Sequence, residues 1–196
     1  TFDYNMLYKV AYLATENLNN VIDVNYYPTS QSKLSNMKHR PIGLGIQGLA
    51  DTLAMMRIPY ESEESIKFNQ HMMETIYFAA MTASKDIAKK RSEMSRFTKI
   101  RDNLPTFYDS DLILENDELN DLYHRLKPNR YELKNTEYLG AYSSFKGSPL
   151  SEGKFQFDLW GVKPLKWDWE PLRKEVLKYG ARNSLLTALM PTASTS

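Results

Sequence analysis

The fold class follows from residues 180–196, which read Gly-Ala-Arg-Asn-Ser-Leu-Leu-Thr-Ala-Leu-Met-Pro-Thr-Ala-Ser-Thr-Ser. Within them, residues 183–190 are almost continuously apolar, as in a parallel strand covered on both faces. A helix is expected just before them, over residues 167–179, and Gly180 is placed to end it. Helix, glycine turn, buried strand and polar loop in this order predict an α/β architecture, in which ligands bind at the carboxyl ends of the strands.

The remainder of the chain is predicted to be rich in helices. Apolar residues recur three and four positions apart over residues 2–23, 49–58 and 62–90. Ser62 can cap the third of these helices, and its methionine-rich apolar stripe is interpreted as core: Ile66, Met72, Met73, Ile76, Ala80, Ala83 and Ile87. Residues 154–160 alternate weakly between polar and apolar.

Two segments oppose regular structure. Residues 25–41 contain two prolines and many polar side chains, which predicts an extended loop. Residues 92–138 crowd charges around short apolar groups, which predicts a surface insertion with one short helix. The insertion interrupts what is otherwise expected to be one domain, or part of one, over residues 1–196.

Composition excludes several classes of protein. The 196 residues carry 25 Lys and Arg against 24 Asp and Glu, so bulk charge supports neither nucleic-acid nor membrane-surface binding. No apolar run approaches the roughly 20 residues that cross a bilayer, and the first residues lack the pattern of a secretory leader, so a cytoplasmic protein is predicted. Without cysteine, the chain has no disulfide, thiolate zinc site, iron–sulfur cluster or thiol nucleophile.

Glycines at 43, 45 and 48 form the pattern G-x-G-x-x-G, which binds dinucleotides when it follows a hydrophobic strand. Here Lys38-His39-Arg40-Pro41 precedes it, so close backbone packing is the favoured interpretation. The three histidines lie far apart without metal-ligand spacing, and no metal site or cofactor is predicted in this segment. The many carboxylates are interpreted as solvated surface, so no catalytic residue is assigned from spacing.

The end of the chain has the clearest binding pattern. Four hydroxyls and a run of small residues at 192–196 can present O–H and backbone N–H donors to a phosphate. A frayed tail or a helix cap explains the same composition, so the residues alone leave both interpretations open.

Three long, ordered stretches resemble the large, catalytic subunit of class I ribonucleoside-diphosphate reductase, particularly its eukaryotic and viral forms. They are residues 36–51 (Asn-Met-Lys-His-Arg-Pro-Ile-Gly-Leu-Gly-Ile-Gln-Gly-Leu-Ala-Asp), Trp169-x-x-Leu172 with Gly180-Ala-Arg-Asn183, and residues 184–196. Three shorter stretches resemble the family as well: Glu74-Thr-Ile-Tyr77, Gly147-Ser-Pro149 and Phe155-Gln-Phe-Asp-Leu-Trp160. The similarity covers most of residues 1–91 and 139–196.

The resemblance implies that the chain is a helix-rich part of a ten-stranded α/β barrel. It further implies that the complete enzyme reduces ribonucleoside diphosphates by radical chemistry for DNA synthesis. It also implies that Thr192, Ala193, Ser194 and Thr195 bind the substrate's diphosphate. The thiols of the reaction would come from the remainder of the large subunit, the radical from a metal-containing small subunit, and electrons from thioredoxin or glutaredoxin. ATP and deoxynucleotide effectors would bind outside this segment.

The chain also departs from the family pattern. Residues 92–138 replace what is normally a short connection, and Ala181 stands where a larger aliphatic residue is usual. Because the chain stops within the substrate loop, we expect a split or interrupted gene or a partial sequence, inactive alone for want of cysteines. The alternative hypothesis is a non-catalytic structural or interaction module derived from the barrel, with residues 92–138 as its partner surface.

Overall fold

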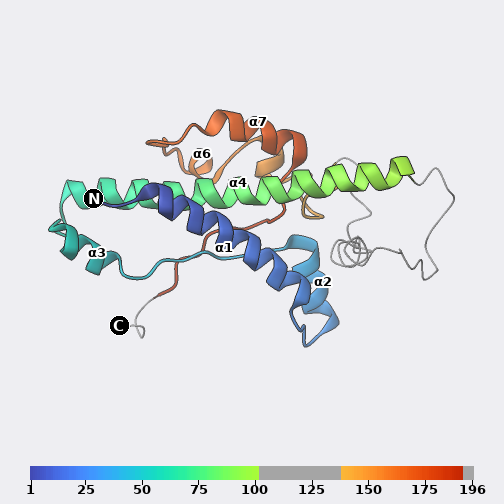
Figure 1. Cartoon of the computed structure of the whole chain (residues 1–196), viewed down its shortest axis with the longest axis horizontal. Coiled ribbons are helices and arrows are strands. Elements are labelled where there is room, and N and C mark those ends of the chain that lie inside the picture. Colours follow the sequence, from blue (N-terminus) through green and yellow to red (C-terminus); the bar gives the residue numbers. More distant parts are fainter. Residues whose placement is uncertain (102–137, 192–196) are drawn as a thin grey trace.

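The computed structural model describes residues 1–101 and 138–191, and only the backbone of residues 94–101. Its longest element is α4 (Glu63–Arg101), which lies between α1 (Tyr4–Val24) on one side and α7 (Trp169–Tyr179) on the other (Figure 1). Asp3 caps α1 by accepting a hydrogen bond from the Met6 backbone N–H at 2.9 Å. The helices predicted over residues 2–23 and 167–179 are therefore confirmed.

Helix α4 confirms the predicted cap and most of the predicted stripe. Ser62 Oγ accepts from the Ser65 N–H at 3.1 Å, and the buried side chains of α4 include Met72, Ile76, Ala80 and Ala83. Ile66 is the exception, because its side chain is exposed. The backbone stays helical past Lys90 to Arg101, so the first ten residues of the predicted insertion continue α4. Residues 102–137 of that insertion lie outside the described part of the chain.

The extended loop predicted over residues 25–41 is wrong, because α2 (Ser30–His39) occupies most of it. Thr29 and Ser32 form a capping box that starts the helix: the Ser32 N–H donates to Thr29 Oγ1 at 3.1 Å. Pro28 and Pro41 lie outside the helix, where they delimit it rather than break it. The next helix, α3 (Leu49–Met56), lies within the range predicted from the apolar spacing.

Within the weakly alternating stretch 154–160, residues 156–160 form a short helix. The 3-10 helix η1 (Pro149–Glu152) is followed by α6 (Gln156–Trp160), and Asp158 stabilises the start of α6 by accepting from the Phe155 N–H at 2.8 Å. Gly180 ends α7 with φ 78°, as its position after the last apolar repeat predicts.

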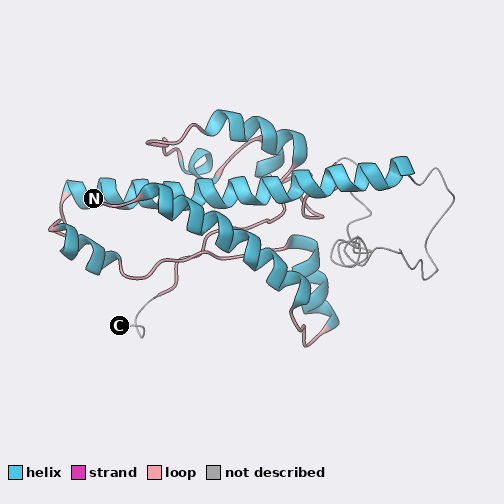
Figure 2. Cartoon of the chain, viewed as in Figure 1, coloured by secondary structure: helices cyan, strands magenta, loops and turns pink. Residues whose placement is uncertain are grey.

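The buried strand predicted over residues 183–190 is also wrong as stated. These residues are extended but pair on one edge only, in parallel with residues 42–44: the Ile42 N–H donates to Leu185 O (3.0 Å), the Leu44 N–H to Leu186 O (2.8 Å), and the Ala188 N–H to Leu44 O (2.9 Å). Leu185 is 63% exposed and Leu189 62%, so they are not covered on both faces. With one partner segment and one isolated bridge, the described residues contain no sheet (Figure 2).

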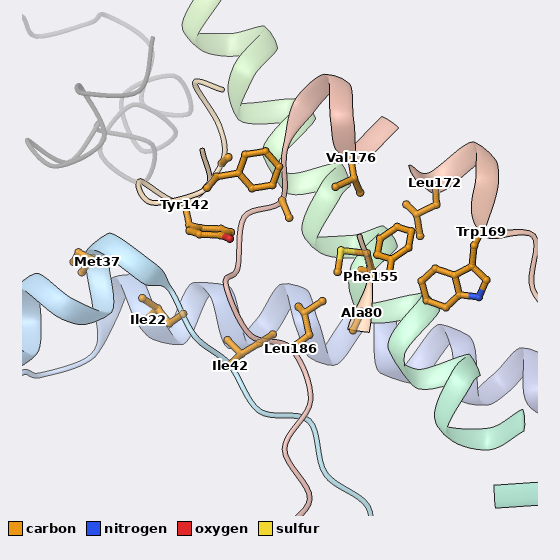
Figure 3. Close-up of a cluster of buried hydrophobic side chains, with 14 residues drawn as sticks. Ile22, Met37, Ile42, Ala80, Tyr142, Phe155, Trp169, Leu172, Val176 and Leu186 are labelled. Carbon is orange, nitrogen blue, oxygen red and sulfur yellow. The ribbon is translucent and has the colours of Figure 1, made fainter. Parts of the chain in front are cut away.

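One face of this parallel pair is nevertheless anchored in the core. Ile42 and Leu186 are buried in a cluster with Ile22 of α1, Phe155 and Trp169 (Figure 3). A second cluster lies between α1, α3 and α4 and contains Ala11, Leu53 and Phe68. The two extended segments are thus held against the packed helices, with parallel register and without further strands among the described residues.

The glycine pattern serves close packing, as the sequence favours. A Cβ at Gly43 would lie 2.9 Å from Ala188 Cβ, and one at Gly45 would lie 2.8 Å from the Ala188 carbonyl oxygen. Both contacts are shorter than side chains tolerate, so the glycines let residues 42–45 approach the 185–188 segment. Gly48 has a separate role. It is the residue directly before α3, and its backbone is left-handed there, with a φ of 80°.

These two contacts predict different responses to a second substitution. Gly43→Ala and Gly45→Ala should each lower the free energy of unfolding by about 1–3 kcal/mol, because the added methyl overpacks the pair. Adding Ala188→Gly should restore the stability of Gly43→Ala, because that clash is with the Ala188 methyl. It should not restore the stability of Gly45→Ala, because that clash is with the backbone carbonyl of residue 188. Urea unfolding of the four variants measures this, and equal rescue of both would contradict the assigned contacts.

Candidate functional site

The predicted diphosphate site, Thr192, Ala193, Ser194 and Thr195, lies outside the described residues. The structure does describe the segment that leads into it, residues 180–191, and many of the contacts that hold this segment in place. The geometry of that support determines where the predicted loop begins.

The segment enters the core through a tight turn at Gly180. A Cβ there would lie 2.6 Å from Ala141 Cβ, so glycine is required by both contact and φ. Ala181 is fully buried in the cluster that contains Ile42 and Leu186. Backbone hydrogen bonds then tie the segment to neighbours on both sides: Tyr142 N–H to Ala181 O (3.0 Å), Arg182 N–H to Ser84 O (3.1 Å) and Ser184 N–H to His39 O (3.0 Å).

Asn183 is fully buried and its amide is satisfied on both ends. Its Oδ1 accepts from Asn19 Nδ2 of α1 and from Ser84 Oγ of α4, each at 2.9 Å. Its Nδ2 donates to Asn19 Oδ1 at 3.0 Å and to the Arg40 carbonyl at 2.9 Å. One side chain therefore links two helices and the segment that precedes the glycine pattern.

Arg40 completes this buried network. Its backbone is left-handed (φ 47°) at the end of α2, and the residue as a whole is only 1% exposed. It forms a two-pronged ion pair with Asp23, at 2.6 and 2.9 Å, and donates to the Asn19 carbonyl at 3.0 Å. A buried cation needs such partners. The network therefore fixes the end of α1 relative to the two paired extended segments, residues 42–44 and 185–188.

A cavity of about 230 Å³ lies beside the extended segment. Its polar lining includes the hydroxyls of Tyr77, Ser148, Ser184 and Thr187, with Lys154 and Gln156. Burial raises the pKa of Tyr77 to about 12, so this phenol is a neutral hydrogen-bonding group near pH 7 rather than a base. Lys154 is paired with Glu152 at 2.7 Å.

Histidines and carboxylates do not gather into a metal site. In residues 1–101 and 138–191, no group of three His, Asp or Glu side chains has suitable geometry. His39 Nδ1 lies 2.6 Å from Ser144 Oγ, and His71 stacks on Tyr4 with ring centroids 3.6 Å apart. Burial lowers the pKa of His71. His124 lies outside the described residues.

Glu74 is a supporting residue that spacing does not reveal. Its carboxylate accepts from the backbone N–H groups of Leu165 (2.9 Å) and Trp167 (3.0 Å), and from the Trp169 indole (3.2 Å). These partners lie more than 90 residues away in sequence, so no local pattern marks the contact. The available signal was the stretch Glu74–Tyr77, which carries part of the family resemblance.

Comparison with known proteins shows which family the chain belongs to. A family model described as the barrel domain of ribonucleotide reductase matches residues 1–196. The chain belongs to this family. It is 42% identical to the ribonucleoside-diphosphate reductase large chain 2 of Saccharomyces cerevisiae and 42% identical to the large subunit of Caenorhabditis elegans, in both cases over the whole chain. It is 38% identical to the large subunit of Acanthamoeba polyphaga mimivirus.

The chain spans only part of these ribonucleotide reductase relatives: 17% of the length of the yeast and mimivirus proteins and 19% of the nematode protein. It matches one portion of the large subunit, and its own 196 residues contain no cysteine. In the described ranges, no helix is both long and apolar enough to span a membrane.

An ion cluster beside the Asn183 network ties α4 to α7. Lys85, next to Ser84, is buried and lies 2.5 Å from Asp86 and 2.6 Å from Glu175. Burial opposes its charge, but the two carboxylates outweigh burial and raise the pKa of Lys85. The hydrogen bond from Lys85 in turn lowers the pKa of Glu175 below its usual 4.5.

This shift predicts a pH-dependent loss of stability. The Glu175 carboxylate contributes stability above its unfolded pKa of about 4.5, and this contribution is lost as the pH falls through the lower folded value. Glu175→Gln should therefore cost about 0.5–1 kcal/mol near pH 7, a small value because the carboxylate is partly exposed, and less at pH 3. Urea unfolding against pH measures the difference. Glu170→Gln, at a more exposed pair with Arg173, is the control with a smaller cost, and a Glu175 effect independent of pH would refute the pair.

Proposed function

We propose that this chain is a segment of a ribonucleoside-diphosphate reductase large subunit, the oxidoreductase that makes deoxyribonucleoside diphosphates from ribonucleoside diphosphates for DNA synthesis. Its role is to supply barrel framework and the loop that binds the substrate's diphosphate. The observation that carries the proposal is the anchored, parallel segment 183–191, which leads directly into Thr192–Thr195. The activity belongs to the complete subunit, because this chain has no cysteine.

The ten-stranded α/β barrel is part of this proposal. Residues 42–44 and 185–188 would be two adjacent parallel strands of that barrel, each pairing on its other edge with strands from the remainder of the subunit. The exposed apolar side chains support such a covering: Leu185, Leu189 and Met190 on the extended segment, and Met6, Val10, Leu13, Val21 and Val24 on α1. More than four-fifths of the relatives' length is available to cover them.

The diphosphate loop would act through preorganised donors. Backbone N–H groups of Thr192, Ala193, Ser194 and Thr195, with three hydroxyls, suit the oxygens of a diphosphate at a strand's carboxyl end. Small side chains permit the backbone to approach the phosphates closely. These residues bind and orient the substrate, and none of them carries the redox step.

The proposed partners are those that membership of the ribonucleotide reductase family implies. The reducing thiols would belong to the remainder of the large subunit, and thioredoxin or glutaredoxin would re-reduce them. A metal-containing small subunit would supply the radical, and ATP and deoxynucleotide effectors would bind elsewhere on the large subunit. The complete enzyme would work in the cytoplasm, without nucleic-acid or membrane partners.

The first test concerns the loop. In the complete subunit, replacing Thr192, Ser194 and Thr195 by alanine should weaken nucleoside-diphosphate binding more than tenfold, because each hydrogen bond to a charged group contributes about 1.5–3 kcal/mol. Thr82→Ala is the control, since that hydroxyl donates to Phe78 O within α4 at 2.7 Å. Equilibrium binding measures both variants, and unchanged affinity of the triple variant would refute the loop assignment.

A second test concerns the polypeptide itself. Intact mass of the native protein containing the Trp169–Asn183 peptide should exceed 22.8 kDa, or a cysteine-bearing large-subunit chain should co-purify with it. Either result supports an enzyme that is whole, spliced or split. A mass of 22.8 kDa without such a partner would instead favour a non-catalytic module derived from the barrel.

A further inference from the structure

The inference concerns Asn183, which stands nine residues before Thr192, at the point where the extended segment leaves α7. Its side chain is fully buried between α1, α4 and the residues that follow α2. It does not line the cavity beside the segment, so its surroundings indicate a role in holding the chain rather than in contacting a ligand.

The amide is used to full capacity. A primary amide has two N–H donors and an oxygen with two lone pairs, and here two partners occupy each end, at 2.9–3.0 Å. The backbone N–H of the same residue donates to Ser84 Oγ at 3.0 Å. An aspartate of the same shape would lose both donors and leave the Arg40 carbonyl and Asn19 Oδ1 unpaired in the core.

These hydrogen bonds coincide with the start of the parallel pairing. Asn183 Nδ2 reaches Arg40 O, the Ser184 N–H reaches His39 O, and the next bond joins Ile42 N–H to Leu185 O. A slip of one residue would break the whole set and leave the Asn183 amide without partners. The buried position of Leu186 alone tolerates such a slip better, because Leu185 has the same side chain, whereas the close approach of Gly43 to Ala188 opposes the slip as well.

The register matters for the loop because little chain separates them. The last described backbone bond of the pair is Ala188 N–H to Leu44 O, four residues before Thr192. A slip of one residue moves an extended chain by about 3.3 Å. A hydrogen bond to a phosphate does not survive such a displacement.

We propose that Asn183 is a positioning residue for the diphosphate loop: its amide, held by Asn19, Ser84 and the Arg40 carbonyl, sets the register of residues 183–191 and thereby places Thr192–Thr195 against the substrate's diphosphate. It acts through the backbone and does not touch the substrate. The inference rests on the proposed function.

The test uses Asn183→Asp in the complete subunit. Affinity for a nucleoside diphosphate should fall at least tenfold, affinity for the matching nucleoside should be unchanged, and KM should rise more than kcat falls. The decisive value is the ratio of the affinity for the nucleoside diphosphate to the affinity for the nucleoside. A purely structural role lowers the amount of folded protein but leaves this ratio unchanged. Thr75→Val is the matched control: Thr75 is equally buried but bonds to His71 O and the Trp167 indole instead. An unchanged ratio in Asn183→Asp overturns the inference.

Combining Asn183→Asp with Ser194→Ala tests whether Asn183 acts through the diphosphate loop. If Asn183 acts through the loop, Asn183→Asp should weaken diphosphate binding less in the Ser194→Ala background than in the wild type. Effects that simply multiply overturn the inference. Should Asn183→Asp fail to fold, Ser84→Ala replaces it, because it removes one hydrogen bond to the amide and one from the Asn183 N–H.

The two proposals fail separately. If alanine at Thr192, Ser194 and Thr195 leaves diphosphate affinity unchanged, the loop assignment fails and the inference fails with it. If that variant weakens binding while Asn183→Asp and Ser84→Ala leave the affinity ratio unchanged, the loop assignment stands and only the role of Asn183 is refuted.

Discussion

The structure depends on hydrogen bonds to buried polar groups where two extended segments lie against packed helices. Residues 42–44 and 185–188 satisfy part of their backbone by pairing with each other, and Asn183, Asn19 and Ser84 satisfy the polar groups at the point where the pair begins. A buried polar group left without a partner costs more free energy than its hydrogen bond contributes when it is formed. The chain therefore has few alternative ways to pack at this point. Arg40 and Asp23 extend the same constraint to the end of α1.

Helices were predictable because their signals are local. Apolar spacing located α1, α3, α4 and α7, and a serine and a glycine marked the start of α4 and the end of α7. Helix α2 was missed because two prolines were interpreted as breakers, although the capping box formed by Thr29 and Ser32 lay between them. The buried strand over residues 183–190 was wrongly predicted for a different reason: an apolar run predicts burial, but its neighbours in a sheet must be present for it to be a buried strand.

The support of the site could be predicted only in part. The glycines at 43 and 45 indicate close approach, and the structure confirms it through Ala188. The partners of Asn183 lie 99 and 164 residues away in sequence, and no periodicity connects residues so far apart. The family resemblance marked Arg40 and Asn183 as members of ordered stretches without giving their contacts, and Asn19 and Ser84 carried no signal at all.

If residues 192–195 bind the substrate's diphosphate, as we propose, a cysteine-free segment is a reasonable place for them. Phosphate binding needs donors fixed to within a few tenths of an ångström, which favours a segment held by buried hydrogen bonds and ion pairs. Thiol chemistry instead needs sulfur atoms that exchange electrons with partners and change their bonding. Under the proposed function, separating the two along the chain would allow redox residues elsewhere in the subunit to react while the network around Asn183 keeps the binding geometry constant. On that proposal, the register of one pair of extended segments would determine how the substrate lies relative to thiols that this segment does not contain.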